Sequence, residues 1–200
     1  MAKYEEFYAK LILEHFFPER YSNLQVQDCP DLSTADGKTG IEVTAAKDPF
    51  EKAAQINAKI TKGQVRDIMG SIQQIEKLGC AYSRWGITCE QDFNRFELLM
   101  NAIHNKIQIL NRGHYQQFEI YDLFITSNIE MDKETLLYAL ALLENMQSNK
   151  NYKFSRVYIA SPWNLYELNA NTQQYFLHEF PSETQNCIAK NAGKMPYCLR

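Results

Sequence analysis

The sequence predicts an α/β protein, with a central mixed β-sheet flanked by helices. Three observations lead to this fold class. The 200 residues are 45% hydrophobic and 22% charged, which is enough apolar material for one sizeable core. Amphipathic helical patterns alternate with short apolar strand patterns along the chain. No repeat or long linker divides the sequence, so a single domain is expected over residues 1–200.

The chain begins with a predicted helix and a predicted β-hairpin. Apolar side chains recur at helical spacing over residues 4–17, and Pro18 ends the run. Residues 24–28 and 40–44 have strand character, and the polar turn at 36–38 separates them. This order predicts two short antiparallel strands directly after the first helix.

A helical insertion follows the hairpin. Residues 49–78 have a helical pattern that is interrupted near Gly63 and Gly70. Residues 79–92 have no clear period and are predicted to be irregular. We therefore expect residues 50–92 to form an insertion in the sheet.

The second half of the chain alternates helices and strands. The periodicity predicts a helix over 96–110, a strand over 120–127, a helix over 132–145, a strand over 157–160 and a strand or helix over 175–180. The tail over residues 181–200 lacks a strong pattern and is expected to be loosely ordered.

The net charge, the cysteine content and the lengths of the apolar runs limit the function classes and the cellular locations that the sequence allows. The net charge of −3 excludes a uniformly basic nucleic-acid coat, although it allows a local basic groove. The five cysteines are scattered without a close pair, which favours free thiols, a reducing compartment and a cytoplasmic location. No apolar run approaches the length that spans a bilayer, so no membrane association is expected.

Two carboxylates stand where adjacent strands would bring them together. Asp31 follows Pro30 just before the predicted turn, and Glu42 lies in the middle of the strand over 40–44. On that strand Glu42 and Thr44 face the side opposite to their apolar neighbours. A carboxylate has low propensity for the middle of a strand, which suggests that this face opens onto a site. Two converging carboxylates suit Mg²⁺, which keeps several water ligands and leaves room for a phosphate.

This pattern resembles the PD-(D/E)XK nuclease superfamily, whose members have the restriction-endonuclease-like fold. The resemblance covers residues 4–160 and depends on Pro30-Asp31, on Glu42-Val43-Thr44, and on the order of the surrounding elements. It implies that Asp31, Glu42 and the backbone carbonyl of Val43 bind Mg²⁺ or Mn²⁺. It also implies hydrolysis of phosphodiester bonds in nucleic acid, with DNA favoured over RNA, and it is compatible with a homodimer.

The sequence departs from the family pattern at Thr44, which stands where the family has its lysine. Some members carry that lysine on a neighbouring helix, and Lys106 is the best candidate here. At about 100° per residue it lies about 70° from the centre of the apolar stripe of its predicted helix. From this border its stem can pack on the core while its ammonium reaches the sheet edge. Lys47 and Lys59 are weaker candidates.

A third acid on the first helix recurs in such folds. Glu5 lies about 80° from the centre of that helix's apolar stripe and fits slightly better than Glu6 or Glu14. The resemblance thus gives Asp31, Glu42, Lys106 and Glu5 as candidate catalytic residues.

Further residues could contact nucleic acid. Lys52, Lys59, Lys62 and Arg66 fall within about 15 positions and could follow a phosphate backbone along one helix face. Three aromatic residues could stack on bases, namely Trp85, Phe93 and Tyr115.

Three function classes therefore stay open. The first is a metal-dependent endonuclease. The second is a nuclease-fold protein without catalysis that binds nucleic acid or protein, which the absence of a lysine at Thr44 motivates. The third is an interaction protein with neither metal nor nucleic-acid affinity, which the acidic balance suggests. We expect the distance of Lys106 from the two acids to discriminate between them, since within about 6 Å opposite charges favour each other's charged forms.

Overall fold

The computed structural model describes residues 4–89, 94–112 and 117–195. Within these ranges the chain forms an α/β fold whose main feature is a seven-stranded mixed sheet. The sheet order is β1-β2-β3-β6-β7-β8-β9. Its strands are β1 (Gln25–Val26), β2 (Leu32–Ser33), β3 (Thr39–Ala46), β6 (Ile120–Ser127), β7 (Phe154–Ala160), β8 (Asn164–Asn169) and β9 (Gln174–Glu179).

The pairing of neighbouring strands changes twice across the sheet, from antiparallel to parallel and back. β1, β2 and β3 form an antiparallel meander, while β3, β6 and β7 run parallel, and β8 and β9 return antiparallel. β3 thus lies between the short strands and the parallel centre. In the β3–β6 register Glu42 is opposite Leu123.

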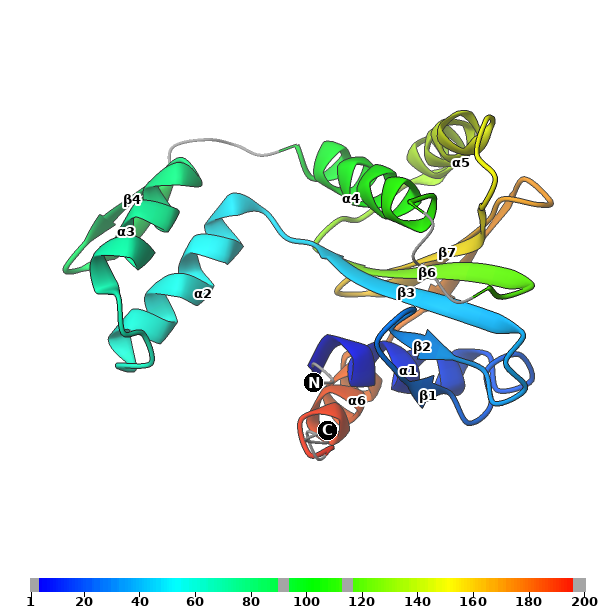
Figure 1. Ribbon diagram of the computed structural model, residues 1–200, viewed down its shortest axis with the longest axis horizontal. Coiled ribbons are helices and arrows are strands. Elements are labelled where there is room, and N and C mark those ends of the chain that lie inside the picture. The colour runs from blue at the N-terminus through cyan, green and yellow to red at the C-terminus, as the bar shows by residue number, and fades with distance from the viewer. Residues whose placement is uncertain (1–3, 90–93, 113–116, 196–200) are drawn as a thin grey trace.

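Helices cover both faces of the sheet (Figure 1). α4 (Arg95–Leu110) and α5 (Lys133–Gln147) pack on one face, where Ile103 and Ile107 are completely buried. α1 (Tyr4–Phe16) and α6 (Ser182–Ala192) cover the other face. Each face therefore has its own hydrophobic core, as expected for a sheet that is buried on both sides.

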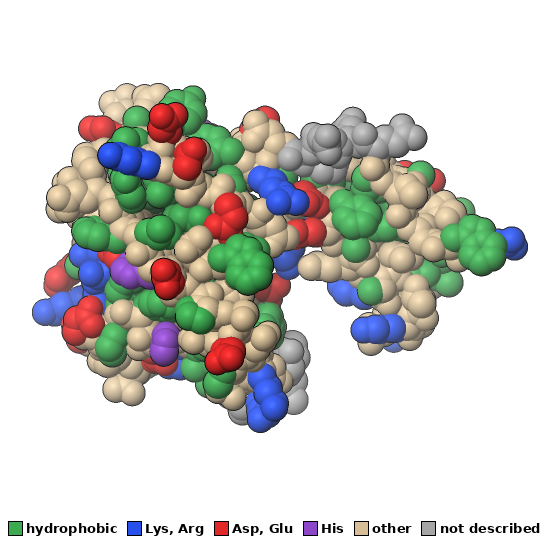
Figure 2. All heavy atoms as spheres, turned by 180° about the vertical axis from the view of Figure 1, so that it is seen from behind, with side chains coloured by type: hydrophobic (Ala, Val, Ile, Leu, Met, Phe, Trp, Pro, Cys, Tyr) green, Lys and Arg blue, Asp and Glu red, His purple; other side chains and the backbone are tan. Residues whose placement is uncertain are grey.

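Residues 49–89 form a unit that extends away from the sheet, which we call the arm (Figures 1 and 2). It contains α2 (Pro49–Thr61), α3 (Ile68–Lys77) and the hairpin of β4 (Cys80–Ser83) and β5 (Gly86–Cys89). Asp48 caps α2 by accepting from the backbone N–H of Glu51 at 2.7 Å. The arm has a small core of its own around Ala53, Ile75 and Cys80.

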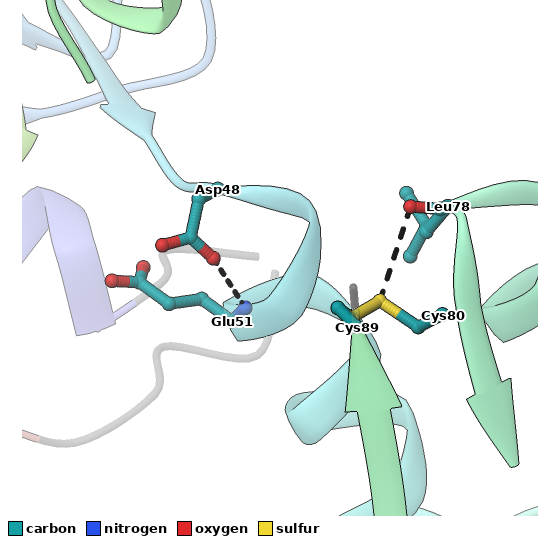
Figure 3. The surroundings of a disulfide bond; sticks show 5 residues. All are labelled: Asp48, Glu51, Leu78, Cys80 and Cys89. Atoms are coloured by element: carbon teal, nitrogen blue, oxygen red, sulfur yellow. Dashed lines mark hydrogen bonds between the residues drawn. A yellow bond between two sulfur atoms is a disulfide. The ribbon is translucent and has the colours of Figure 1, made fainter. Parts of the chain in front are cut away.

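A disulfide between Cys80 and Cys89 closes the arm's hairpin (Figure 3). The two residues are direct partners in the β4–β5 register, with Cα atoms 4.3 Å apart. The expectation of an irregular segment over 79–92 is therefore wrong for residues 80–89, and so is the expectation that all cysteines are free thiols. Residues 90–92 of that segment lie outside the described residues. The short strands carry too few alternating residues to be recognised as strands from sequence.

Several sequence predictions are confirmed. Helices occur at 4–16, 95–110 and 133–147, and strands at 120–127 and 154–160, all within a few residues of the predicted bounds. The predicted mixed sheet with flanking helices, preceded by an N-terminal helix and short strands, is also present. The ambiguous segment over 175–180 is the strand β9.

Other predictions require correction. The predicted two-stranded hairpin is a three-stranded meander, since β2 pairs with both β1 and β3. Gly70 does not interrupt a helix, since it lies in the first turn of α3. Its backbone N–H donates to Oδ1 of Asp67, the N-cap residue of that helix, at 2.8 Å. β8 was not predicted, since its sequence lacks a clear alternation of apolar and polar residues.

The tail is also more ordered than predicted. Residues 182–192 form α6, in which Ile188 packs into the core beneath α1 and Ala192 is also buried. The side chain of Gln185 donates to the backbone carbonyl of Pro162 at 2.6 Å and ties this helix to the sheet. This helix owes its place to tertiary contacts, because its few apolar residues give little local signal. Residues 196–200 lie outside the described residues.

None of the described helices is long and apolar enough to cross a membrane. The cytoplasmic location stays a prediction.

Candidate functional site

The candidate site lies at β3, on the edge of the face that α4 covers. Along this strand Ile41 and Val43 point into the core beneath α1, so Glu42 points to the opposite side, toward α4. Glu42 is only 3% exposed. A carboxylate at this depth requires a charged or hydrogen-bonding partner, because burial without one is costly.

Lys106 supplies that charge. Its Nζ lies 2.5 Å from Oε2 of Glu42 and 3.7 Å from Oδ2 of Asp31. The neighbours Ile103 and Ile107 anchor α4 in the core, which leaves Lys106 at the border of the buried stripe as the helical spacing predicts. Both distances are well below about 6 Å, so the ammonium of Lys106 lies beside both carboxylates.

Asp31 is fixed by the backbone of the neighbouring strand. Its Oδ2 accepts a hydrogen bond of 2.7 Å from the backbone N–H of Val43. The backbone carbonyl of Asp31 accepts from the N–H of Gln27 at 3.0 Å, which holds the turn between β1 and β2. The meander therefore places the Asp31 carboxylate beside β3, so that Asp31, Glu42 and Lys106 meet although they are up to 75 residues apart in sequence.

Asp31, Val43 and Lys106 line a pocket of about 280 Å³, which we call the acidic pocket, whereas the buried Glu42 is not among its lining residues. α1 contributes Glu5 and Glu6, while Thr44 and Ala45 continue the β3 wall. Glu6 is buried, and Glu5 is held by Lys47, whose Nζ lies 3.2 Å from its Oε1. Both glutamates of α1 therefore contribute to the pocket, whereas sequence reasoning preferred Glu5.

The remaining candidates lie elsewhere. Glu14 lies in the last turn of α1, where it accepts from Lys10 and from the backbone N–H of Leu24, and it does not line the pocket. Lys59 lies on α2 in the arm and does not line this pocket. Of the aromatic candidates, Trp85 is exposed beside Arg84, whose guanidinium carbon lies 4.5 Å from its ring centroid. Phe93 and Tyr115 lie outside the described residues.

The donor set suits a hard cation with a partly hydrated shell. Among the residues that the structure describes, no three side chains of His, Cys, Asp or Glu converge as a metal-binding group. Asp31, Glu42 and the carbonyl of Val43 could supply three oxygen ligands, a small set that is typical of Mg²⁺ because this ion retains water. The set lacks the nitrogen and sulfur ligands that zinc prefers.

A second polar cluster lies on the opposite face of the sheet, beneath α1. The buried Asp122 accepts from the hydroxyl of Tyr21 at 2.5 Å, and Tyr21 contacts the hydroxyl of Tyr158 at 2.9 Å. Burial raises the pKa of Asp122 to about 6, while the Tyr21 hydrogen bond and the charge of Arg156 act in the other direction. The sequence predicts only a strand over residues 120–127 and gives no indication of this polar cluster.

Comparison with known protein families, with curated proteins and with solved structures finds no match for this chain. The function of this protein is therefore inferred from the residues of the site alone.

Proposed function

We propose that this protein is a metal-dependent nuclease with a restriction-endonuclease-like core, which hydrolyses phosphodiester bonds of nucleic acid, DNA in preference to RNA. One observation carries the proposal: the ammonium of Lys106 contacts both Asp31 and Glu42, and Lys106 and Asp31 line the acidic pocket beside β3. Two carboxylates and one lysine, brought from three separate elements, are the set that the sequence pattern implies for this chemistry.

Each residue has a distinct role in the proposed reaction. Asp31, Glu42 and the carbonyl of Val43 would hold Mg²⁺ or Mn²⁺, which when bound polarises the scissile phosphate and lowers the pKa of a bound water. Lys106 would hold its ammonium against the charge that develops on the phosphate, and it would orient the attacking water. Glu5 and Glu6 would add negative charge to the wall of the pocket.

The experiment is a cleavage assay with Mg²⁺ or Mn²⁺ on single- and double-stranded DNA and RNA. Glu42→Gln should abolish metal-dependent cleavage while the protein stays folded, because it removes a charged ligand without changing the side chain's size. The exposed Glu144 provides the control, and Glu144→Gln should cleave like the wild type. Equal cleavage by the wild type and Glu42→Gln would refute the proposal.

A second candidate function is a nuclease-fold protein that binds nucleic acid or protein without cleaving it. The observation in its favour is the ion pair itself, because the ammonium of Lys106 lies 2.5 Å from Oε2 of Glu42 and neutralises this carboxylate directly. Thr44 at the motif position also favours it. Retained nucleic-acid binding with no turnover in either metal would support this function.

The homodimer also stays a prediction. Sedimentation of the purified protein would test it.

A further inference from the structure

A second pocket of about 240 Å³ adjoins the acidic one. It lies where the end of β3 and the start of α2 face α4, and it shares Thr44, Ala45 and Lys106 with the first pocket. Its charged side chains are Lys47, Lys52 and Lys106, and the amides of Asn101 and Asn105 add further hydrogen-bond donors. No carboxylate is among its described lining residues. We call it the lysine pocket.

The three lysines of the lysine pocket differ in their ion-pair partners. Lys106 contacts Glu42 and Asp31, and Lys47 contacts Glu5. Of these carboxylates, Asp31 and Glu5 line the acidic pocket. Lys52 is exposed and makes no ion pair with any residue in the described part of the chain. The lysine pocket therefore has one cation available for an anionic ligand, and two more that are shared with the neighbouring carboxylates.

α2 extends this positive surface away from the sheet. Lys59 follows Lys52 after seven residues, which is close to two helical turns, so both lie on the same face of α2, about 10 Å apart along its axis. Both are exposed. At this spacing the two side chains can contact successive phosphates of one strand that runs along α2.

The arm as a whole has the charge that such a ligand requires. Residues 49–89 contain six basic and three acidic side chains, a net charge of +3. Because the whole chain carries −3, the remaining residues carry −6. The basic side chains are therefore concentrated in the unit that extends from the site, and an otherwise acidic protein presents a local surface that attracts polyanions.

We propose that the lysine pocket binds the backbone phosphates of the nucleic-acid strand next to the scissile bond, and that Lys52 and Lys59 guide this strand along α2. The proposal rests on the proposed function, since it places the substrate relative to the acidic pocket. Phosphate contacts position a strand without reading its sequence, so the arm fixes where the strand enters the site.

The test measures binding without metal. A fluorescein-labelled DNA duplex with a single-stranded overhang is titrated with protein in EDTA, and fluorescence anisotropy gives the dissociation constant at several salt concentrations. Lys52→Gln and Lys59→Gln are compared with Lys77→Gln, which removes an exposed lysine from α3 of the same arm. Circular dichroism melting confirms that all three variants fold.

We expect Lys52→Gln and Lys59→Gln each to weaken binding on the order of tenfold at about 50 mM salt, and to reduce the slope of log K against log salt by about 0.9, which is the effect of one phosphate contact. Lys77→Gln should bind like the wild type. If all three variants match the wild type while the wild type binds and cleaves DNA, the lysine pocket is not a strand site but the nuclease proposal stands. If the wild type binds no DNA or RNA at all, both proposals fail.

Discussion

Lys106 connects the sequence pattern to the observed site. Thr44 shares its face of β3 with Glu42 but carries no charge, so it cannot neutralise the carboxylates. The cation comes instead from α4, where Lys106 reaches across to β3. A helix that packs on the sheet can thus provide the charge that the strand itself lacks.

The first prediction concerns the strength of this pairing. Lys106→Met should lower the free energy of unfolding by roughly 1–3 kcal/mol, because it removes the ammonium group that contacts the buried carboxylate of Glu42. Glu42→Gln should also destabilise the protein, and the double variant should lose less than the sum of the two. Urea denaturation of the four proteins gives the coupling energy. Strictly additive losses would show that the two side chains do not interact.

The second prediction concerns Asp122 and pH. Because burial raises its pKa from 3.8 to about 6 in the folded protein, the folded state binds more protons than the unfolded state between these values. The contribution of Asp122 to the free energy of unfolding is therefore fully present at low pH and is lost as pH rises from about 4 through about 6.

Asp122→Asn should remove this dependence. As pH rises from about 4 to about 7, the free energy of unfolding of the variant should increase relative to that of the wild type by on the order of 3 kcal/mol. Urea denaturation at both pH values measures it, and Asp28→Asn on the exposed surface is the matched control. A wild type and an Asp122→Asn variant with the same pH profile would contradict the assignment.

At the scale of elements, the arm depends on few stabilising contacts. Only Ala53, Ser71, Ile75 and Cys80 are buried within it, and its hairpin is short. A two-stranded hairpin is marginal by itself in water. The hairpin is therefore held in place by the Cys80–Cys89 disulfide and by its packing on α2 and α3.

The third prediction follows from that disulfide. Joint replacement of Cys80 and Cys89 by alanine should lower the stability of the arm by about 2–3 kcal/mol, the loop-closure value for a bridge of this separation. Hydrogen exchange should speed up in residues 68–89 while β6 and β7 stay protected. Cys187→Ala, which removes an exposed free thiol, should have no such effect. Uniform acceleration throughout the sheet would show that the arm is not a separate stability unit.

At the scale of the molecule, charge is divided between neighbouring surfaces. The acidic pocket lies at the junction of α1 and β3, the lysine pocket adjoins it, and the arm continues from there with its positive charge. Figure 2 shows an open notch between the arm and the sheet layers. The acidic surface suits a cation, and the basic surfaces suit the phosphates that would lie beside it.

The fourth prediction uses the stability of the whole protein to detect that cation. Mg²⁺ or Mn²⁺ should raise the melting temperature of the wild type, because a ligand that binds only the folded state adds RT ln(1 + [L]/Kd), about 2.7 kcal/mol at a hundredfold excess over Kd. Glu42→Ala should lose the increase, and the surface control Glu144→Ala should keep it. A metal response that survives in Glu42→Ala would locate the cation elsewhere.

The main elements and the candidate residues could be predicted from local sequence patterns. Strong periodicity is a local property, so the long helices α1, α4 and α5 and the strand β6 could be located from their own residues. The same holds for Asp31 and Glu42, whose positions in a turn and a strand are readable in a short segment, and for the border position of Lys106 on its helix.

The contacts between these elements, which bring the candidate residues together, depend on the tertiary structure. The 2.5 Å contact of Lys106 with Glu42 spans 64 residues of sequence and depends on how α4 packs across β3. The Cys80–Cys89 pair, the helix α6 and the meeting of Lys47, Lys52 and Lys106 in one pocket could not be predicted from the sequence either. Each arises from contacts between elements, and such contacts leave no period or motif in the residues that make them.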